Sequence, residues 1–201
     1  EGYCARELIG RGAASIRGVD ISEKMIELAK TTNAEDGLNI DYSVGSVIEL
    51  AYESESADLA LGVFVYNYLP VADVKASFKE VYRVLKPGGH FIFSVPHPAF
   101  SFIRKEHAAP FYFDVEGNGY FSGRDTQFQG KIHCRDGQIL DVQMIAKSFE
   151  DYFEALNESG FSTMPEVREL HVTDEMLALD HEFFSPVADV PLHVAMKIKK
   201  Q

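Results

Sequence analysis

Short apolar runs alternate with amphipathic segments through the first 98 residues, and this alternation constrains the fold more than any other feature. The apolar runs predict strands, and the segments with 3.6-residue periodicity predict helices. The strands are expected at 15–20, 39–45, 57–69 and 90–98, and the helices at 3–10, 22–30 and 71–85. This order predicts βαβ units and a doubly wound, mainly parallel α/β sheet.

Individual segments carry sharper expectations. Ser22 is a candidate N-cap, and the helix after it is expected to bury one stripe made by Met25, Ile26, Leu28 and Ala29. The run 57–69 is almost continuously apolar, which predicts a strand buried on both faces. A helix over 148–159 is expected to end at Gly160, and a strand at 191–198 is expected to close the sheet.

The rhythm changes between about residues 99 and 147. This segment is rich in aromatic residues and carries turn signals at 117–119 and 135–137. Such a pattern favours antiparallel hairpin strands inserted into the α/β fold. We therefore expect one domain over 1–201 with an insertion at about 99–147.

Composition limits the partners and the compartment. The net charge of −12 and the lack of a basic stripe disfavour nucleic acid as a partner. No apolar run reaches the roughly 18 residues of a membrane span. Cys4 and Cys134 lie far apart and lack CxxC spacing, so we expect no metal site and free thiols in a reducing, cytoplasmic compartment.

Asp20 stands at the end of the predicted strand 15–20, directly before a helix. A solvated or helix-capping carboxylate is one interpretation. The other is a hydrogen-bond acceptor for the hydroxyls of a ligand at the carboxyl edge of the sheet. The stretch GRGAAS at 10–15 imitates a glycine-rich fingerprint, but it follows a helix and precedes a strand, which is the reverse of the required order.

The ordered motifs EGYCAREL, GVDISEKMIELAK, GSVIEL, ADLALGVFVYNYL and VLKPGGHFIFSVPHP cover residues 1–98. Together they resemble the class I S-adenosylmethionine-dependent methyltransferases, in particular the small-molecule branch called methyltransferase type 11, with a Rossmann-like fold. That family begins with a strand and a glycine-rich turn, of which Glu1 and Gly2 resemble only the tail. We therefore expect a further strand and turn ahead of Glu1.

The resemblance implies S-adenosylmethionine as the cofactor and S-adenosylhomocysteine as the product. It places Asp20 on the ribose hydroxyls and Ile21 and Met25 on the adenine. The remaining cofactor residues that it implies are Glu1, Gly2, Tyr3, Ser46, Val47, Val63 and Phe64. Many family members carry Asp where Ser46 stands, so the adenine contact of Ser46 is open.

The acceptor side is less defined by the sequence. His97 follows the predicted strand 90–98 and either orients or deprotonates the acceptor, or is a loop histidine without chemistry. Tyr66, Asn67, Tyr68 and Tyr112 are further candidates to line the acceptor pocket. The aromatic insertion is expected to act as a lid over the site; the alternative is an accessory sheet or a homodimer contact.

The expected function is methyl transfer to a small-molecule acceptor. One alternative is a catalytically silent, methyltransferase-like binding subunit, against which Asp20 argues. Another is a dinucleotide-dependent oxidoreductase. The LKPGG motif directly before the strand at 90–98 disfavours this alternative.

Overall fold

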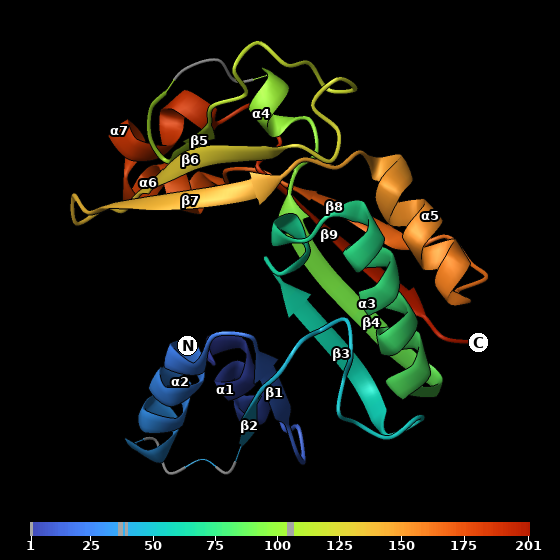
Figure 1. The fold of residues 1–201 in the computed structure, drawn as a ribbon. Coiled ribbons are helices and arrows are strands. Elements are labelled where there is room, and N and C mark those ends of the chain that lie inside the picture. Colours follow the sequence, from blue (N-terminus) through green and yellow to red (C-terminus); the bar gives the residue numbers. More distant parts are fainter. Residues whose placement is uncertain (1, 36–37, 39, 104–106) are drawn as a thin grey trace. The chain divides into compact units, whose positions relative to one another are not determined.

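The computed structural model describes residues 2–35, 38, 40–103 and 107–201 (Figure 1). The chain forms two compact units, Glu1–Tyr52 and Glu53–Gln201, and each is described by itself. Within the described residues, the structure has no helix that is both long and apolar enough to cross a membrane. The expectation of a single domain with an insertion stays a prediction.

The first unit contains a short parallel sheet with helices. Its elements are α1 (Tyr3–Gly10), β1 (Arg17–Asp20), α2 (Glu23–Glu35) and β2 (Asp41–Val44). Gly18 of β1 lies opposite Tyr42 of β2, and a Cβ atom on Gly18 would lie 2.6 Å from the Tyr42 ring. Glycine at position 18 therefore lets the Tyr42 ring cross β1.

The buried stripe of α2 differs from the predicted one. Ile26 and Ala29 are buried, and Asn33 one turn later is buried too. Leu28 is 44% exposed, so its predicted burial was wrong. The buried face follows i, i+3 and i+7 spacing from Ile26, which turns Leu28 toward solvent.

The second unit is built on a four-stranded sheet in the order β3-β4-β9-β8. β3 and β4 are parallel, whereas β9 is antiparallel to both of its neighbours. The strands are β3 (Ala57–Val63), β4 (Leu85–Pro96), β8 (Glu166–Leu170) and β9 (His193–Lys199). The strand predicted at 191–198 is present, but it lies inside the sheet, and the unpredicted β8 forms the edge.

Helices α3 (Val71–Val84) and α5 (Phe149–Ser159) pack on one face of this sheet (Figure 1). Phe78 of α3, Phe91 and Phe93 of β4 and Tyr152 of α5 share the core there. Ala60 of β3 packs against the same core, whereas Leu59, on the other side of the strand, is 39% exposed. The prediction that 57–69 is buried on both faces was therefore wrong: alternate residues of β3 point away from the helices.

The aromatic segment forms the predicted antiparallel strands. β5 (Phe111–Phe113), β6 (Gln127–His133) and β7 (Ile139–Ile145) make a three-stranded sheet in sequence order. Gly137, with a φ of 87°, lies in the β6–β7 turn, as the signal at 135–137 predicts, whereas 117–119 lies in the long β5–β6 loop.

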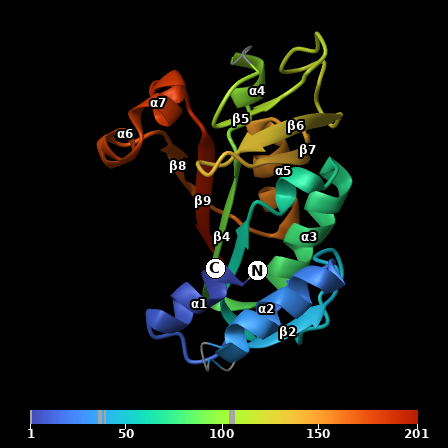
Figure 2. The same cartoon turned by 90° about the vertical axis from the view of Figure 1, so that its left-hand side faces the viewer.

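A second core lies beneath these strands. Phe100, Phe111, Phe113 and Phe128 pack there with Val187 and Leu192. The elements around it include α4 (Phe100–Ile103), α6 (Asp174–Leu179), α7 (His181–Phe184) and η2 (Ser185–Val187). The last three lie between β8 and β9 in the chain, and Figure 2 shows α6 and α7 beside these strands. The α/β fold class with an inserted antiparallel segment is confirmed.

Candidate functional site

Asp20 is the last residue of β1, and its side chain lies at the carboxyl end of the strand. Its Oδ1 atom accepts a hydrogen bond of 2.8 Å from the backbone N–H of Ser22. Ser22 Oγ in turn accepts one of 3.3 Å from the N–H of Met25, as the N-cap prediction requires. The residue is exposed, so the turn fixes the carboxylate while solvent still reaches it.

The other predicted cofactor residues of the first unit lie on loops and helix starts. Ile21 is 80% exposed, and Met25 is half-buried. Tyr3 is 66% exposed and opens α1. Ser46 and Val47 are half-buried in the turn after β2. Glu1 lies outside the described residues.

Gly2 has a structural requirement of its own. Its φ is 75°, and a Cβ atom would lie 2.2 Å from the hydroxyl oxygen of Tyr42. Its carbonyl accepts from the N–H of Arg6 at 3.1 Å. Burial raises the pKa of Tyr42, although the Arg6 guanidinium opposes that shift. The left-handed backbone favours glycine here, and any other residue would also require the Tyr42 ring to shift.

In the second unit, Val63 and Phe64 stand at the carboxyl end of β3. Each is 38% exposed. Phe64 has a φ of 52°, a conformation that is rare for a bulky residue. Its N–H donates a 2.9 Å hydrogen bond to the carbonyl of Ser94 on β4, which holds the unusual turn in place. Backbone strain of this kind is concentrated at functional sites.

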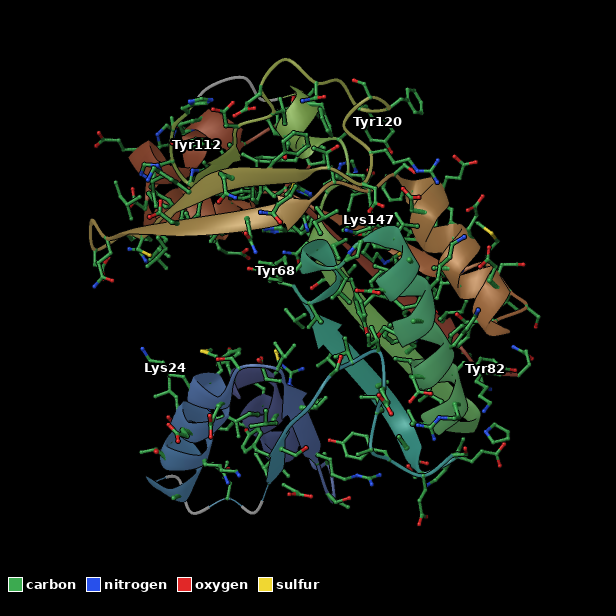
Figure 3. The ribbon with its side chains drawn as sticks, viewed as in Figure 1. Lys24, Tyr68, Tyr82, Tyr112, Tyr120 and Lys147 are labelled. Carbon is green, nitrogen blue, oxygen red and sulfur yellow. The ribbon has the colours of Figure 1, made fainter. Side chains whose placement is uncertain are left out.

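Tyr66, Asn67 and Tyr68 form the turn η1 (Tyr66–Tyr68), but their side chains have different surroundings. The Tyr66 ring packs edge-on against Phe78 and Phe93 in the core, and burial raises its pKa. Tyr68 is 46% exposed (Figure 3). Asn67 is buried, and its Oδ1 has no hydrogen-bond partner in the part of the chain that the structure describes. Tyr68 is therefore open to solvent, the Asn67 amide is enclosed without a partner for its oxygen among the described residues, and Tyr66 packs as a core residue.

His97 is buried, and both of its ring nitrogens are engaged. Nδ1 accepts from the N–H of Ala99 at 3.2 Å, and Nε2 lies 2.9 Å from Oε1 of Glu169. The ring also packs edge-on against Phe149 at 5.2 Å. These contacts favour a role in holding the loop after β4, and a catalytic role for His97 stays a prediction.

Tyr112 lies apart from the other candidates of the second unit. Side chains alternate between the faces of a strand, so Tyr112 of β5 faces away from Phe111 and Phe113, which enter the second core. Its ring stacks on His107, with centroids 4.5 Å apart.

No sequence motif points to His193, the first residue of β9. Its ring stacks on Phe111 with centroids 5.3 Å apart and meets Phe64 edge-on at 4.8 Å. Burial lowers its pKa to about 4, so the ring is neutral at pH 7. Only the antiparallel pairing of β9 with β4, which no local pattern reveals, brings it to this end of the sheet.

The inserted strands are fastened to the loop between η1 and α3. Lys147 Nζ donates to the carbonyls of Leu69 and Ile145, each at 2.6 Å (Figure 3). Burial lowers the pKa of this lysine to about 8. Asp125 Oδ1 accepts from the N–H of Val71 at 2.8 Å. Two independent contacts therefore hold the insertion against the segment that leads from η1 into α3.

Comparison with known protein families identifies the fold. Residues 1–89 match the family model described as "Methyltransferase domain". Residues 1–89 thus resemble the methyltransferase-domain family, and the chain shares its fold with a solved S-adenosylmethionine-dependent methyltransferase. The resemblance of the motifs over residues 1–98 is confirmed.

Two similar proteins are also named as methyltransferases. Over 145 residues the chain is 28% identical to demethylmenaquinone methyltransferase of Lactococcus lactis. This alignment covers 71% of this chain and 52% of that protein. It is 36% identical over 83 residues to a ubiquinone biosynthesis O-methyltransferase of Sinorhizobium fredii, covering 41% of this chain and 33% of that protein. The chain thus spans about half the length of the first relative and a third of the second.

A solved structure shows the same fold. The crystal structure of an S-adenosylmethionine-dependent methyltransferase from Mesorhizobium loti superposes with a TM-score of 0.72 and 24% identity. The match covers 99% of this chain and 86% of the other.

Proposed function

We propose that the chain transfers a methyl group from S-adenosylmethionine to a small-molecule acceptor. The observation that carries the proposal is the exposed carboxylate of Asp20 at the carboxyl end of β1, held by the N–H of Ser22. A carboxylate in this position can accept both hydroxyls of a ribose. The match of residues 1–89 to the methyltransferase-domain family supports this assignment.

The residues of the first unit suit the cofactor. Ile21, which is 80% exposed, and Met25 supply apolar surface for adenine beside Asp20. We assign Ser46 and Val47 to the adenine edge, and Glu1, Gly2 and Tyr3 to the start of the cofactor loop. In the second unit, we assign Val63 and Phe64 to the methionine part.

When bound, S-adenosylmethionine supplies an electrophilic sulfonium methyl group, so the chain has to supply position and a dry surface. Alignment of the reacting groups can contribute about 7–11 kcal/mol. We assign the half-exposed Tyr68 and the buried amide of Asn67, which follow β3 in the chain, to the acceptor. We propose a quinone-type aromatic ring as the acceptor, because two relatives are named for demethylmenaquinone and ubiquinone biosynthesis.

The proposal includes the cellular compartment and the domain organisation. Cys4 and Cys134 are both free, which suits a reducing, cytoplasmic compartment. We propose one methyltransferase domain over 1–201, with the segment at about 99–147 covering the acceptor. A homodimer contact through that segment is the alternative.

Calorimetric titration with S-adenosylhomocysteine tests the assignment of Asp20. Hydrogen bonds to a charged group contribute about 1.5–3 kcal/mol each, so the Asp20→Ala variant should bind at least tenfold more weakly than wild type. Asp41→Ala is the matched control, because Asp41 is also exposed but begins a strand instead of ending one. NAD serves as the competing ligand. Equal affinity of wild type and Asp20→Ala for S-adenosylhomocysteine, or tighter binding of NAD, contradicts the proposal.

A further inference from the structure

His193 is fixed at the carboxyl end of β4 by backbone contacts on two sides. In the β4–β9 register it lies opposite Pro96, the last residue of β4. The carbonyl of the preceding residue, Leu192, accepts from the N–H of His97 at 3.0 Å, and the Leu192 N–H donates to Leu170 of β8 at 2.9 Å. His193 therefore has little freedom to leave the edge at which ligands bind in α/β sheets.

The side chain of His193 is held by aromatic rings. Its ring is nearly parallel to that of Phe111, with an interplanar angle of 7°, and it meets the ring of Phe64 at 61°. Phe111 belongs to the insertion, and Phe64 is the strained residue at the end of β3. The His193 ring thus joins the end of the sheet to the inserted strands.

The polar atoms of this ring are unused. Neither ring nitrogen of His193 has a hydrogen-bond partner within residues 2–35, 38, 40–103 and 107–201. Both nitrogens of the neighbouring His97 are occupied, by Glu169 and by the N–H of Ala99. Neither nitrogen is fully enclosed by the protein, so a ligand can reach the ring and form a hydrogen bond with it.

We propose that His193 binds the methyl acceptor, its neutral imidazole accepting a hydrogen bond from a hydroxyl group on a flat aromatic ring. The ring of the acceptor lies against the exposed part of Phe64, which is 38% of that residue's surface. This inference rests on the proposed function and deepens it, because it names the group that orients the acceptor. The backbone N–H of His97 helps to place His193, because it donates to the carbonyl of the preceding residue, Leu192.

Two substitutions separate the polar role of His193 from its packing. His193→Phe keeps a ring between Phe64 and Phe111 but removes both nitrogens. His193→Gln keeps a hydrogen-bond acceptor and loses the aromatic ring. His171→Phe is the matched control, because His171 is an exposed histidine directly after β8.

The acceptor probes are catechol and 1,4-dihydroxynaphthalene under reducing conditions. With S-adenosylmethionine as donor, His193→Phe should lower kcat/KM for both at least tenfold, and His193→Gln should lower it less. The affinity for S-adenosylhomocysteine should stay within twofold of wild type in both. Unchanged methyl transfer by His193→Phe overturns the inference.

Nuclear magnetic resonance of the imidazole nitrogens reports directly on binding at His193. If His193 had only a structural role, adding an acceptor would leave its nitrogen resonances unchanged. In the complex with S-adenosylhomocysteine, adding either probe should shift the His193 nitrogen resonances and leave those of His171 in place. Unmoved His193 resonances overturn this inference alone, whereas failure of the wild type to bind S-adenosylhomocysteine overturns the proposed function itself.

Discussion

His97 uses both ring nitrogens inside the protein, so its removal should act first on stability. Loss of a buried hydrogen-bonding group costs about 1–3 kcal/mol, and we expect His97→Ala to lower the free energy of unfolding in urea by that amount. Glu169→Gln should cost less, because the side chain of Glu169 is 63% exposed. If His97→Ala keeps its stability but loses methyl transfer, His97 acts directly on the acceptor, as its position in the sequence suggests.

The lowered pKa of Lys147 predicts that the free energy of unfolding depends on pH through this one residue. Its pKa is about 8 in the folded protein and about 10.5 in the unfolded chain, so the unfolded chain binds more protons between these values and stability rises with pH. We expect a gain of about 1–2 kcal/mol between about pH 8 and 9.5, measured by urea unfolding. Lys147→Met should abolish this rise, and the exposed control Lys24→Met should retain it. A rise that persists in Lys147→Met assigns it to another group.

At the scale of an element, a few local hydrogen bonds define the start of helix α5. Ser148 Oγ accepts from the N–H of Asp151, and the Asp151 carboxylate accepts from the N–H of Ser148 at 2.8 Å, which completes a capping box. Burial alone would raise the pKa of Asp151, but hydrogen bonds from Arg124 and Ser148 lower it below its usual value. The helix start and the loop that carries Arg124 are therefore held by one carboxylate.

We expect Ser148→Ala to destabilise the protein by about 1 kcal/mol through loss of the cap. Asp151→Asn should cost about 2–4 kcal/mol, because it also removes the ionic partner of Arg124 from a buried position. Glu150→Gln is the control, since Glu150 is exposed in the same helical turn. Denaturant unfolding at pH 7 measures all three. A cost for Glu150→Gln that matches Asp151→Asn would mean that net charge, not the capping box, is responsible.

Elements with complete local signals could be predicted from the sequence. The helix predicted at 148–159 with a stop at Gly160 is confirmed as α5, and the turn predicted at 135–137 joins β6 to β7. β8 has no such signal, because all five of its residues are exposed and no apolar alternation marks it. The left-handed backbone of Phe64 and the place of His193 depend on pairing between distant strands, and a local pattern carries no information on these contacts. The predicted cofactor residues rest on family motifs and remain to be tested.

At the scale of the whole molecule, the cores of the two units differ in size. Among the described residues, the core of the first unit consists of Ile26, Ala29, Ile40 and Tyr42. The second unit has two larger clusters, one around Phe78 and Phe91 and one around Phe100 and Phe111. Each buried side chain of this kind contributes about 1.5–3 kcal/mol, so the smaller core should open more often.

Native-state hydrogen exchange tests this difference and the role of Asp20 together. Amides of β1 and β2 should exchange faster than those of β4 and β9, because exchange follows the free energy of local opening. S-adenosylhomocysteine at about 100 times its Kd should stabilise whatever it binds by about 2.7 kcal/mol. If Asp20 holds the ribose, protection at β1 should then rise by up to about 100-fold in wild type and little in Asp20→Ala at the same ligand concentration. Protection that rises only in β4 and β9 would place the ligand on the second unit and remove Asp20 from the site.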